Sequence, residues 1–385
     1  MRLSCYSGVD GYRFVWYIHT VAKEKNKYWV VLVLSLFVLY VFIAAQPVPR
    51  ETIMVPRWLS SLESDYSADM AVEGQPIQDY LIPFKLGNRF GYVNTQGKFT
   101  INQPVKGAGR AAVSLSDERW VEYDAVPDAV TIRSNQGDAL MVIEHVRGYP
   151  LFLDGKIFLI GEEQTSLSLV NESGELLWTY DFAAPLTGID AASDLILTGT
   201  LDGTVELLDI SGRRVYFFEP GGSRLAVILG CRIAKDGSRL AIVSGYDDQR
   251  FLLLEKFGDS YRVVYHEFLE DGFRRAVHIS FAGDNRWIVF ERQGGLGLYE
   301  IETRRSIKVP LRGAIIALDD GGNDSLIFAI SSLGGRSKIL AALHLPGLLV
   351  LEAPFSSETA FFSRRGSEIY VGGDMTLASF KLEKR

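Results

Sequence analysis

Hydrophobic and polar residues are arranged in two different ways along this chain of 385 residues. Residues 28–45 form an apolar run without a charged side chain. From residue 81 to the end, short runs of Val, Ile, Leu, Phe and Tyr are separated by turns rich in Gly, Asp, Asn and Ser. Such runs, without a 3.6-residue period, are typical of β-strands joined by hairpins. The pattern therefore predicts one apolar helix followed by an all-β domain.

The hairpin turns recur at a regular distance. Six of them lie on average about 42 residues apart, at 134–138, 171–175, 210–214, 256–260, 301–305 and 344–348. A second set lies between these, at 152–161, 190–199, 233–245, 280–290, 318–330 and 362–373. Two hairpins, and so four strands, in each repeat are the unit of a β-propeller blade. Such blades stack around an axis because one sheet cannot bury both of its faces alone.

The repeat length predicts a seven-bladed β-propeller for residues 86–385, with eight blades as the alternative. The last repeat, from Thr359, lacks one strand. We expect hairpin 89–102 to supply that outer strand and close the ring, which removes exposed sheet edges. The predicted organisation is a cytoplasmic segment 1–27, a transmembrane signal anchor 28–46, an extended linker 47–80 and a propeller domain 81–385.

Two consecutive repeats, VNESGELLWTYDF at 170–182 and DLILTGTLDGTVELLDISGRRVYFF at 194–218, resemble blades of bacterial WD40-like and quinoprotein-like propellers. The GH and WD dipeptides of WD40 repeats are missing, and the likeness to quinoprotein repeats rests on Trp178 and its neighbours. Hairpin 89–102 resembles a single WG-type repeat with Tyr92 in place of Trp. The resemblance implies a propeller whose loops and rim are available for binding.

Residues 28–46 are predicted to span a membrane, because about 20 apolar residues in a helix cross about 30 Å of hydrocarbon. Five basic residues precede the run, and only Arg50 and Arg57 lie in the twenty residues after it. The positive-inside rule then keeps residues 1–27 in the cytoplasm of a cell (inner) membrane and places the propeller outside it. A cleaved signal peptide is the alternative. The predicted anchor residues are Tyr28, Trp29, Leu32, Leu36, Leu39 and Phe42.

Charge differs between the two sides of this run. Residues 1–27 carry a net charge of +3, and since the whole chain has −7, the residues after the run sum to −10. A domain this acidic excludes nucleic acid as the partner. The two cysteines, Cys5 and Cys231, lie on opposite sides of the predicted membrane, so no disulfide is expected. Cys231 is expected to be a buried thiol.

No motif in the sequence indicates a catalytic, cofactor or metal site. DDGGND at 319–324 lacks the glutamate of a calcium loop. KGAGRAA at 106–112 matches a dinucleotide fingerprint, but strand-like alternation follows it where a helix is needed. Asp190 is the one carboxylate in the strands of inner type, too few for an acid–base pair. The histidines lack metal-ligand spacing: His19, His145, His266, His278 and His344.

Aromatic and basic residues gather in 212–224 and 259–268, and alternation is expected to turn several of them outward as an interaction surface. Packing between blades is the alternative. The residues are Arg213, Tyr216, Phe218, Tyr261 and Tyr265. We therefore predict a membrane-anchored extracytoplasmic β-propeller that serves as a protein-binding or envelope-assembly scaffold for another envelope protein, without a cofactor. The alternatives are a ligand-binding sensor or enzyme with its site in the axial channel, and a signalling receptor; a function other than catalysis is favoured.

Overall fold

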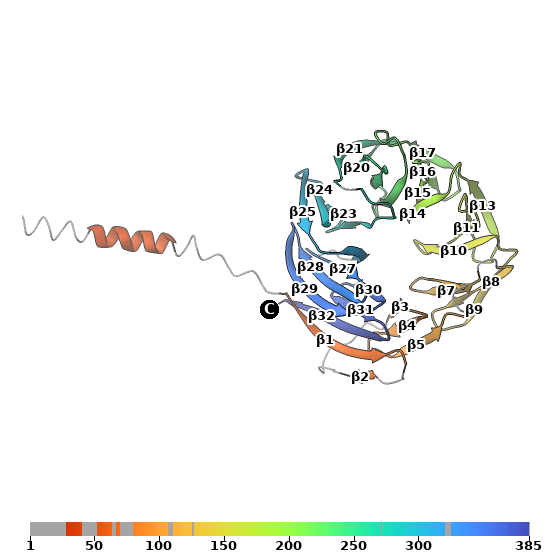
Figure 1. The fold of residues 1–385 in the computed structure, drawn as a ribbon, viewed down its shortest axis with the longest axis horizontal. Coiled ribbons are helices and arrows are strands. Elements are labelled where there is room, and N and C mark those ends of the chain that lie inside the picture. Colours follow the sequence, from red (N-terminus) through yellow and green to blue (C-terminus); the bar gives the residue numbers. More distant parts are fainter. Residues whose placement is uncertain are drawn as a thin grey trace, which may run out of the picture. The chain divides into compact units, whose positions relative to one another are not determined.

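The computed structural model describes residues 28–40, 52–63, 67–69, 80–106, 111–124, 127–270, 272–319 and 325–384. It divides into two units, Met1–Thr52 with Lys384–Arg385, and Ile53–Glu383. In the first unit, residues 28–40 form a helix with exposed apolar side chains. In the second unit, eight antiparallel sheets are arranged around a common centre (Figure 1).

Each sheet is one blade of a propeller, and the blades are numbered here along the chain. Blade 1 has three strands: β3 (Leu81–Leu86), β4 (Arg89–Asn94) and β5 (Phe99–Pro104). Blade 8 combines both ends of the domain: β30 (Ala360–Arg365), β31 (Glu368–Gly373), β32 (Thr376–Lys384), β1 (Thr52–Ser61) and β2 (Ser67–Asp69).

Blades 2 to 7 have four strands each, in sequence order from the centre of the ring outward (Figure 1). Blade 2 contains β6 (Ala112–Leu115), β7 (Arg119–Tyr123), β8 (Ala129–Ser134) and β9 (Ala139–Glu144), and blade 3 contains β10 (Gly148–Leu153), β11 (Lys156–Gly161), β12 (Ser166–Val170) and β13 (Leu176–Asp181). Blade 4 contains β14 (Leu186–Ala192), β15 (Leu195–Thr200), β16 (Val205–Asp209) and β17 (Arg214–Phe218), and blade 5 contains β18 (Ile228–Ile233), β19 (Arg239–Ser244), β20 (Arg250–Phe257) and β21 (Ser260–Phe268). Blade 6 contains β22 (Ile279–Ala282), β23 (Trp287–Arg292), β24 (Gly295–Glu300) and β25 (Arg305–Pro310), and blade 7 contains β26 (Ala314–Leu318), β27 (Leu326–Gly334), β28 (Ser337–His344) and β29 (Leu348–Ser356).

The six regularly spaced turns of the sequence are confirmed. Each joins the third strand of a blade to its outermost strand, in blades 2 to 7. Strand composition follows strand position. Every residue of β23 is buried, because neighbouring blades cover both faces of a second strand, whereas β29 alternates between exposed and half-buried residues. The all-β prediction therefore holds at the level of single strands.

Apolar side chains fill the space between each pair of adjacent blades. The buried residues form eight clusters, and each cluster combines residues of two neighbouring blades. Between blades 5 and 6, for example, Phe251 stacks on Phe290 with ring centroids 4.2 Å apart. The ring is completed by the cluster that packs Trp58 and Tyr370 of blade 8 against Phe84 of blade 1. Each sheet thus hides its apolar faces against its neighbours.

The ring is closed by a different segment from the one predicted. The fourth strand of blade 8 is β1, which pairs with β32, whereas hairpin 89–102 forms β4 and β5 inside blade 1. The prediction of an extended linker over 47–80 is therefore wrong for residues 52–61 and 67–69, which form β1 and β2. Prolines had indicated a linker, yet Pro56 lies within β1, and an outer position in a sheet tolerates a residue without an N–H.

The predicted count of seven blades is wrong, and the alternative of eight is confirmed. The estimated repeat length was not the cause. Blade 1 occupies only Leu81–Pro104, because it has three strands, and blade 8 takes two of its strands from before residue 81. Both features let eight blades fit where full repeats would give seven.

The predicted anchor 28–46 overlaps the helix at residues 28–40, and residues 1–27 and 41–46 lie outside the described part of the chain. None of the helices in that described part combines the length and apolar character needed to cross a membrane.

Candidate functional site

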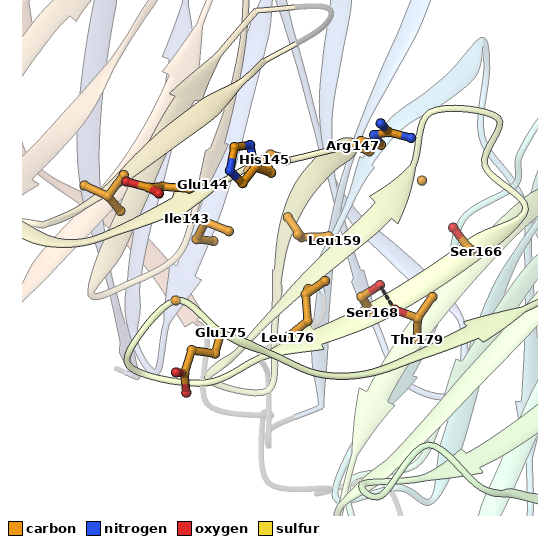
Figure 2. A pocket seen from close by; sticks show the side chains of 14 residues that line it. Ile143, Glu144, His145, Arg147, Leu159, Ser166, Ser168, Glu175, Leu176 and Thr179 are labelled. Carbon is orange, nitrogen blue, oxygen red and sulfur yellow. Dashed lines mark hydrogen bonds between the residues drawn. The ribbon is translucent and has the colours of Figure 1, made fainter.

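A groove opens between blade 2 and blade 3, with a volume of about 630 Å³. One side is formed by the end of β9 and the residues that follow it, and the other by the β11, β12 and β13 side of blade 3 (Figure 2). The lining residues are Val142, Ile143, Glu144, His145, Val146, Arg147, Leu159, Gly161, Ser166, Ser168, Gly174, Glu175, Leu176 and Thr179.

The first side of the groove follows from alternation along β9. Met141 and Ile143 are buried in the apolar cluster shared with blade 3, whereas Val142 is exposed. The β12–β13 turn approaches β9 through Gly174, which has φ +86°, and a Cβ there would lie 2.5 Å from the backbone oxygen of Val142. Only glycine permits this approach in this backbone conformation. The turn therefore bounds the groove beside β9.

The second side of the groove carries short hydroxyl side chains from blade 3. Ser168 and Thr179 are partners across β12 and β13, and their hydroxyl oxygens are 2.8 Å apart (Figure 2). Gly161 faces Ser166, and a Cβ at Gly161 would lie 2.3 Å from the Ser166 Oγ. Long apolar side chains fill the corresponding space in a close-packed interior. Short side chains at these positions leave an open volume instead.

Charged groups surround an apolar centre made by Leu159 and Leu176 (Figure 2). Exposed Glu144 and Arg147 contribute opposite charges from the β9 side, and Glu175 accepts a hydrogen bond of 2.9 Å from the Asn171 side chain. An apolar centre with a polar rim is typical of surfaces that bind other proteins. A serine nucleophile needs a hydrogen bond to a general base. The Ser168 hydroxyl is hydrogen-bonded to the Thr179 hydroxyl instead. The arrangement can bind a partner by burying apolar side chains.

A second polar arrangement lies on the inner strands, where Asp190 of β14 meets Arg232 of β18. The Asp190 Oδ1 lies 3.2 Å from the Arg232 Nη1, and the Asp190 Oδ2 accepts a hydrogen bond of 2.9 Å from the Ile233 backbone N–H. Arg232 also donates to the Ile279 carbonyl at 3.1 Å. Burial raises the pKa of Asp190, and Arg232 partly offsets that increase. These bonds link blades 4, 5 and 6 near the axis.

Glu291 of β23 forms a similar link between blades 6 and 7. Its buried carboxylate accepts hydrogen bonds from the Arg275 guanidinium at 2.5 and 3.0 Å and from the Ile315 backbone N–H at 3.3 Å. His278 lies beside this pair, and burial is the main cause that lowers its pKa.

Neither of these two carboxylates is free for acid–base chemistry, since Asp190 and Glu291 are each paired with an arginine. Within the residues that the structure describes, no group of three His, Cys, Asp or Glu side chains is arranged to hold a metal ion. Asp190, predicted to be the one carboxylate in the strands of inner type, has an arginine partner in the structure. The geometry of these links is that of structural connections between blades.

Most residues of the predicted interaction surface lie between blades. Tyr216 and Phe218 of β17 pack against the cluster of blades 4 and 5, and the Tyr216 ring lies 5.3 Å from that of buried Tyr261. Tyr265 stacks on Tyr299 of blade 6 with centroids 4.0 Å apart. These rings are thus packed between blades, which was the alternative to an exposed interaction surface. A role of theirs in binding stays a prediction.

Arg213 is the exposed member of that predicted surface, and its guanidinium is bound to Asp209 at 2.7 Å. The apolar residues that do face outward on β17 are Val215 and Phe217, and the Arg214 guanidinium lies 5.1 Å from the Phe217 ring centroid. Alternation was therefore recognised in this strand, but with the opposite parity. A shift of one residue exchanges the two faces of a strand.

The predicted anchor residues Tyr28, Trp29, Leu32, Leu36 and Leu39 lie on the helix at residues 28–40 and are exposed, while Phe42 lies outside the described residues. The expectation of a buried Cys231 is confirmed, because its free thiol is buried between blades 4 and 5 and burial raises its pKa to about 12.

The groove itself was not predicted from the sequence. Its signals were present: Ser166 and Ser168 alternate with leucines in β12, and Leu176 and Leu177 are adjacent apolar residues in an outermost strand. These signals indicate a groove only when β9 of blade 2 is known to lie opposite these strands of blade 3.

Comparison with known proteins agrees with this architecture. A family model described as beta-propeller protein matches residues 20–384. An uncharacterized protein of Treponema pallidum (strain Nichols) is 23% identical over 364 residues, which are 92% of this chain and 94% of the relative. The crystal structure of BamB from Moraxella catarrhalis has a TM-score of 0.59 at 14% identity, covering 86% of this chain and 100% of that one. The computationally designed Ika8 protein has a TM-score of 0.58 at 14% identity, covering 79% of this chain and 97% of that one. At these identities the two structures show the fold alone.

Proposed function

This chain belongs to the beta-propeller protein family, and we propose that it is a binding scaffold that holds another protein of the cell envelope in the groove between blades 2 and 3. The observation that carries the proposal is the groove itself, with its apolar centre, polar rim and open side. Its volume of about 630 Å³ lies within the range of about 300–1,000 Å³ typical of ligand sites. It is large enough for a few side chains of a partner that also contacts the surrounding surface.

Apolar residues beside the groove support the same function. Leu140 and Val142 of β9 and Leu176 and Leu177 of β13 are all exposed. Burying the exposed area of such side chains against a partner contributes about 25 cal/mol per Å². Grouped exposed apolar residues on a soluble domain mark surfaces that bind other molecules. The likeness to BamB adds support at the level of fold only.

We also propose that residues 28–46 anchor the propeller to the cell (inner) membrane, with the N-terminus in the cytoplasm. The support is the uncharged run at 28–45 and the excess of basic residues before it. The helix at residues 28–40 presents apolar side chains that are all exposed. Transfer of such side chains from water into a lipid bilayer lowers the free energy.

A photo-crosslinking residue at position 176 tests the groove. Leu176 is 57% exposed and lines the groove, and Leu348 on blade 7 is 65% exposed, so it serves as the matched control. We expect a crosslinked partner from position 176 and none from position 348 in native envelopes. In addition, Leu176→Glu should reduce the yield of the partner crosslinked from a neighbouring groove position such as 142. Equal crosslinking from positions 176 and 348 would contradict the proposal.

Protease treatment of spheroplasts tests the membrane orientation. We expect digestion of the propeller and protection of a tag placed at the N-terminus, because the two lie on opposite sides of the membrane. Loss of the tag with an intact propeller would reverse the proposed topology.

The second candidate function is a ligand-binding sensor or enzyme with its site in the axial channel. The observation that favours it is the position of half-exposed Arg232 and His278 on or beside inner strands. A thermal-shift screen with small anions tests it, and a stabilisation that Arg232→Met abolishes would support it. Without such a shift, these groups serve to connect blades.

A further inference from the structure

Blade 1 is one strand short of the other blades. It contains β3, β4 and β5, whereas each of the other seven sheets has four or five strands. The third strands of blades 3, 4, 6 and 7 are largely buried, as in β12 and β24, where all residues but one are buried, and even β8 of blade 2 has two buried residues of six. In β5 no residue is buried, and none of the described strands pairs with its outer edge. Within the described residues, the position of a fourth strand in blade 1 is therefore open.

Backbone groups of β5 point into this open position. The Val105 N–H donates to the Asn88 carbonyl at 2.8 Å, and pairing continues through Pro104 with Arg89 and Gln103 with Phe90. Hydrogen-bonded and non-bonded pairs alternate in an antiparallel ladder. Asn102 pairs with Gly91, next to the bonded pair of Gln103 and Phe90, and therefore directs its backbone N–H and C=O away from β4. An edge of this kind is a template for another strand.

Side chains hold the middle of β5 in place while its outer edge stays open. The Asn102 Oδ1 accepts a hydrogen bond from the Arg89 Nε at 2.9 Å, and the Asn102 Nδ2 donates to the Leu62 carbonyl at 3.0 Å. Ile101 packs against the cluster shared with blade 2. The two faces of β5 are thus fixed by neighbouring blades, so a strand added at the edge meets a preformed template.

The charge of blade 1 is opposite to that of the whole chain. Residues 81–106 contain Lys85, Arg89, Lys98 and Lys106 and no acidic residue, in a chain of net charge −7. Lys98 directly precedes β5, and Lys106 follows it. The Lys106 side chain is 80% exposed, and its Nζ lies 3.9 Å from the Glu122 carboxylate, which is 13% exposed and also accepts a hydrogen bond from the Lys106 backbone N–H. Exposed positive charge therefore flanks both ends of the open edge.

We propose that the outer edge of β5 is a docking edge that takes an extended, acidic segment of a partner protein as the fourth strand of blade 1. Main-chain hydrogen bonds along Phe99–Pro104 hold the added strand. Carboxylates at its two ends meet Lys98 and Lys106. This edge is separate from the groove between blades 2 and 3, so the inference goes beyond the proposed function and does not depend on it.

The chain contains one competitor for this edge. Residues 70–79, which follow β2, carry two acidic residues and no basic one, so the same chemistry would recognise them. Occupation by this segment is a distinct outcome of the experiment, because it would protect the amides of β5 before any partner is added.

The experiment uses the full-length protein and a short fluorescein-labelled peptide that alternates glutamate with valine and threonine. We expect saturable binding by fluorescence anisotropy. We also expect at least tenfold slower hydrogen exchange of the Asn102 backbone amide once the peptide is bound. The double variant Lys98→Glu/Lys106→Gln should weaken binding by about tenfold, since it removes or reverses charge at both ends of the edge. Lys235→Glu, on the exposed β18–β19 turn of blade 5, is the matched control and should change affinity less than about twofold.

A peptide with lysine in place of glutamate should bind at least tenfold more weakly. Equal binding of the two peptides, or equal loss from the Lys235 variant and the double variant, would refute the proposed charge recognition. If the Asn102 backbone amide is already protected from exchange without peptide, the edge is not open. That result would refute the proposal and would mean that a segment of this chain occupies the edge. Failure of this experiment leaves crosslinking at position 176 unaffected, so the two proposals fail separately.

Discussion

Removing the side chain of Trp58 should destabilise the whole propeller, because this residue connects the last blade to the first. Trp58 is 4% exposed and its Nε1 donates a hydrogen bond of 2.9 Å to the Thr95 carbonyl of blade 1. Its ring lies 6.0 Å from that of Tyr370 in blade 8, and Gly97 packs directly against it. The strand that closes the ring thus also holds the β4–β5 turn.

The expected loss can be estimated from these contacts. Replacing a buried Phe or Trp by Ala costs about 3–5 kcal/mol in stability. The Thr95 carbonyl also loses its donor, which adds about 1 kcal/mol. We therefore expect Trp58→Ala to lower the free energy of unfolding by about 4–6 kcal/mol, a large part of the about 5–15 kcal/mol typical of folded domains. Leu59 is the matched control, because it is adjacent in β1 and 46% exposed.

Equilibrium urea unfolding, followed by tryptophan-independent far-UV circular dichroism, measures both variants against the parent chain. Leu59→Ala should change the free energy of unfolding by less than about 1 kcal/mol, as is usual for an exposed position. If Trp58→Ala and Leu59→Ala have equal effects, β1 does not hold the ring together and the argument for closure by this strand is refuted.

The Cys231 thiol should resist iodoacetamide at pH 8 in the folded protein and react after denaturation, because burial raises its pKa to about 12; peptide mass spectrometry measures this, and rapid native labelling would contradict it. His278 should make stability fall as pH decreases below about 6.5: its folded pKa is lowered, so the unfolded chain binds the proton first. Urea unfolding between pH 7 and 5 should show a smaller pH dependence in His278→Gln, and an unchanged slope would refute this assignment. Gly174→Ala should destabilise the protein by at least about 1 kcal/mol more than Gly155→Ala, since both glycines have positive φ but only the Gly174 Cβ would meet backbone, at 2.5 Å; equal midpoints in thermal unfolding would contradict the close contact of the β12–β13 turn.

Local features of the fold could be predicted well from the sequence. Turns such as NESGE at 171–175 can be predicted from their residues. Gly174 has a positive φ that other residues rarely adopt, so a glycine at this position indicates a turn. The apolar runs predict the strands, and the repeat of four strands predicts a propeller. These features depend on neighbours along the chain, which a sequence displays directly.

The closure of the ring could not be predicted in this way. Residues 52–61 have an apolar pattern, but prolines such as Pro56 and the mixed charge of the segment favoured a linker. Their partner, β32, lies at the opposite end of the domain. The same limitation reversed the parity of β17, where Tyr216 faces the next blade and Phe217 faces outward.

By itself, the sequence determined that this protein contains an apolar run and a domain of stacked four-stranded repeats, because alternation, turn residues and repeat length are encoded locally. Only the tertiary structure decided the number of blades, the strand that joins the two ends, the groove beside Gly174 and the open edge of β5. Each of these depends on which segments meet across the ring. Such contacts form between residues that are far apart in the chain, and the free energy that selects them comes from side-chain packing between blades.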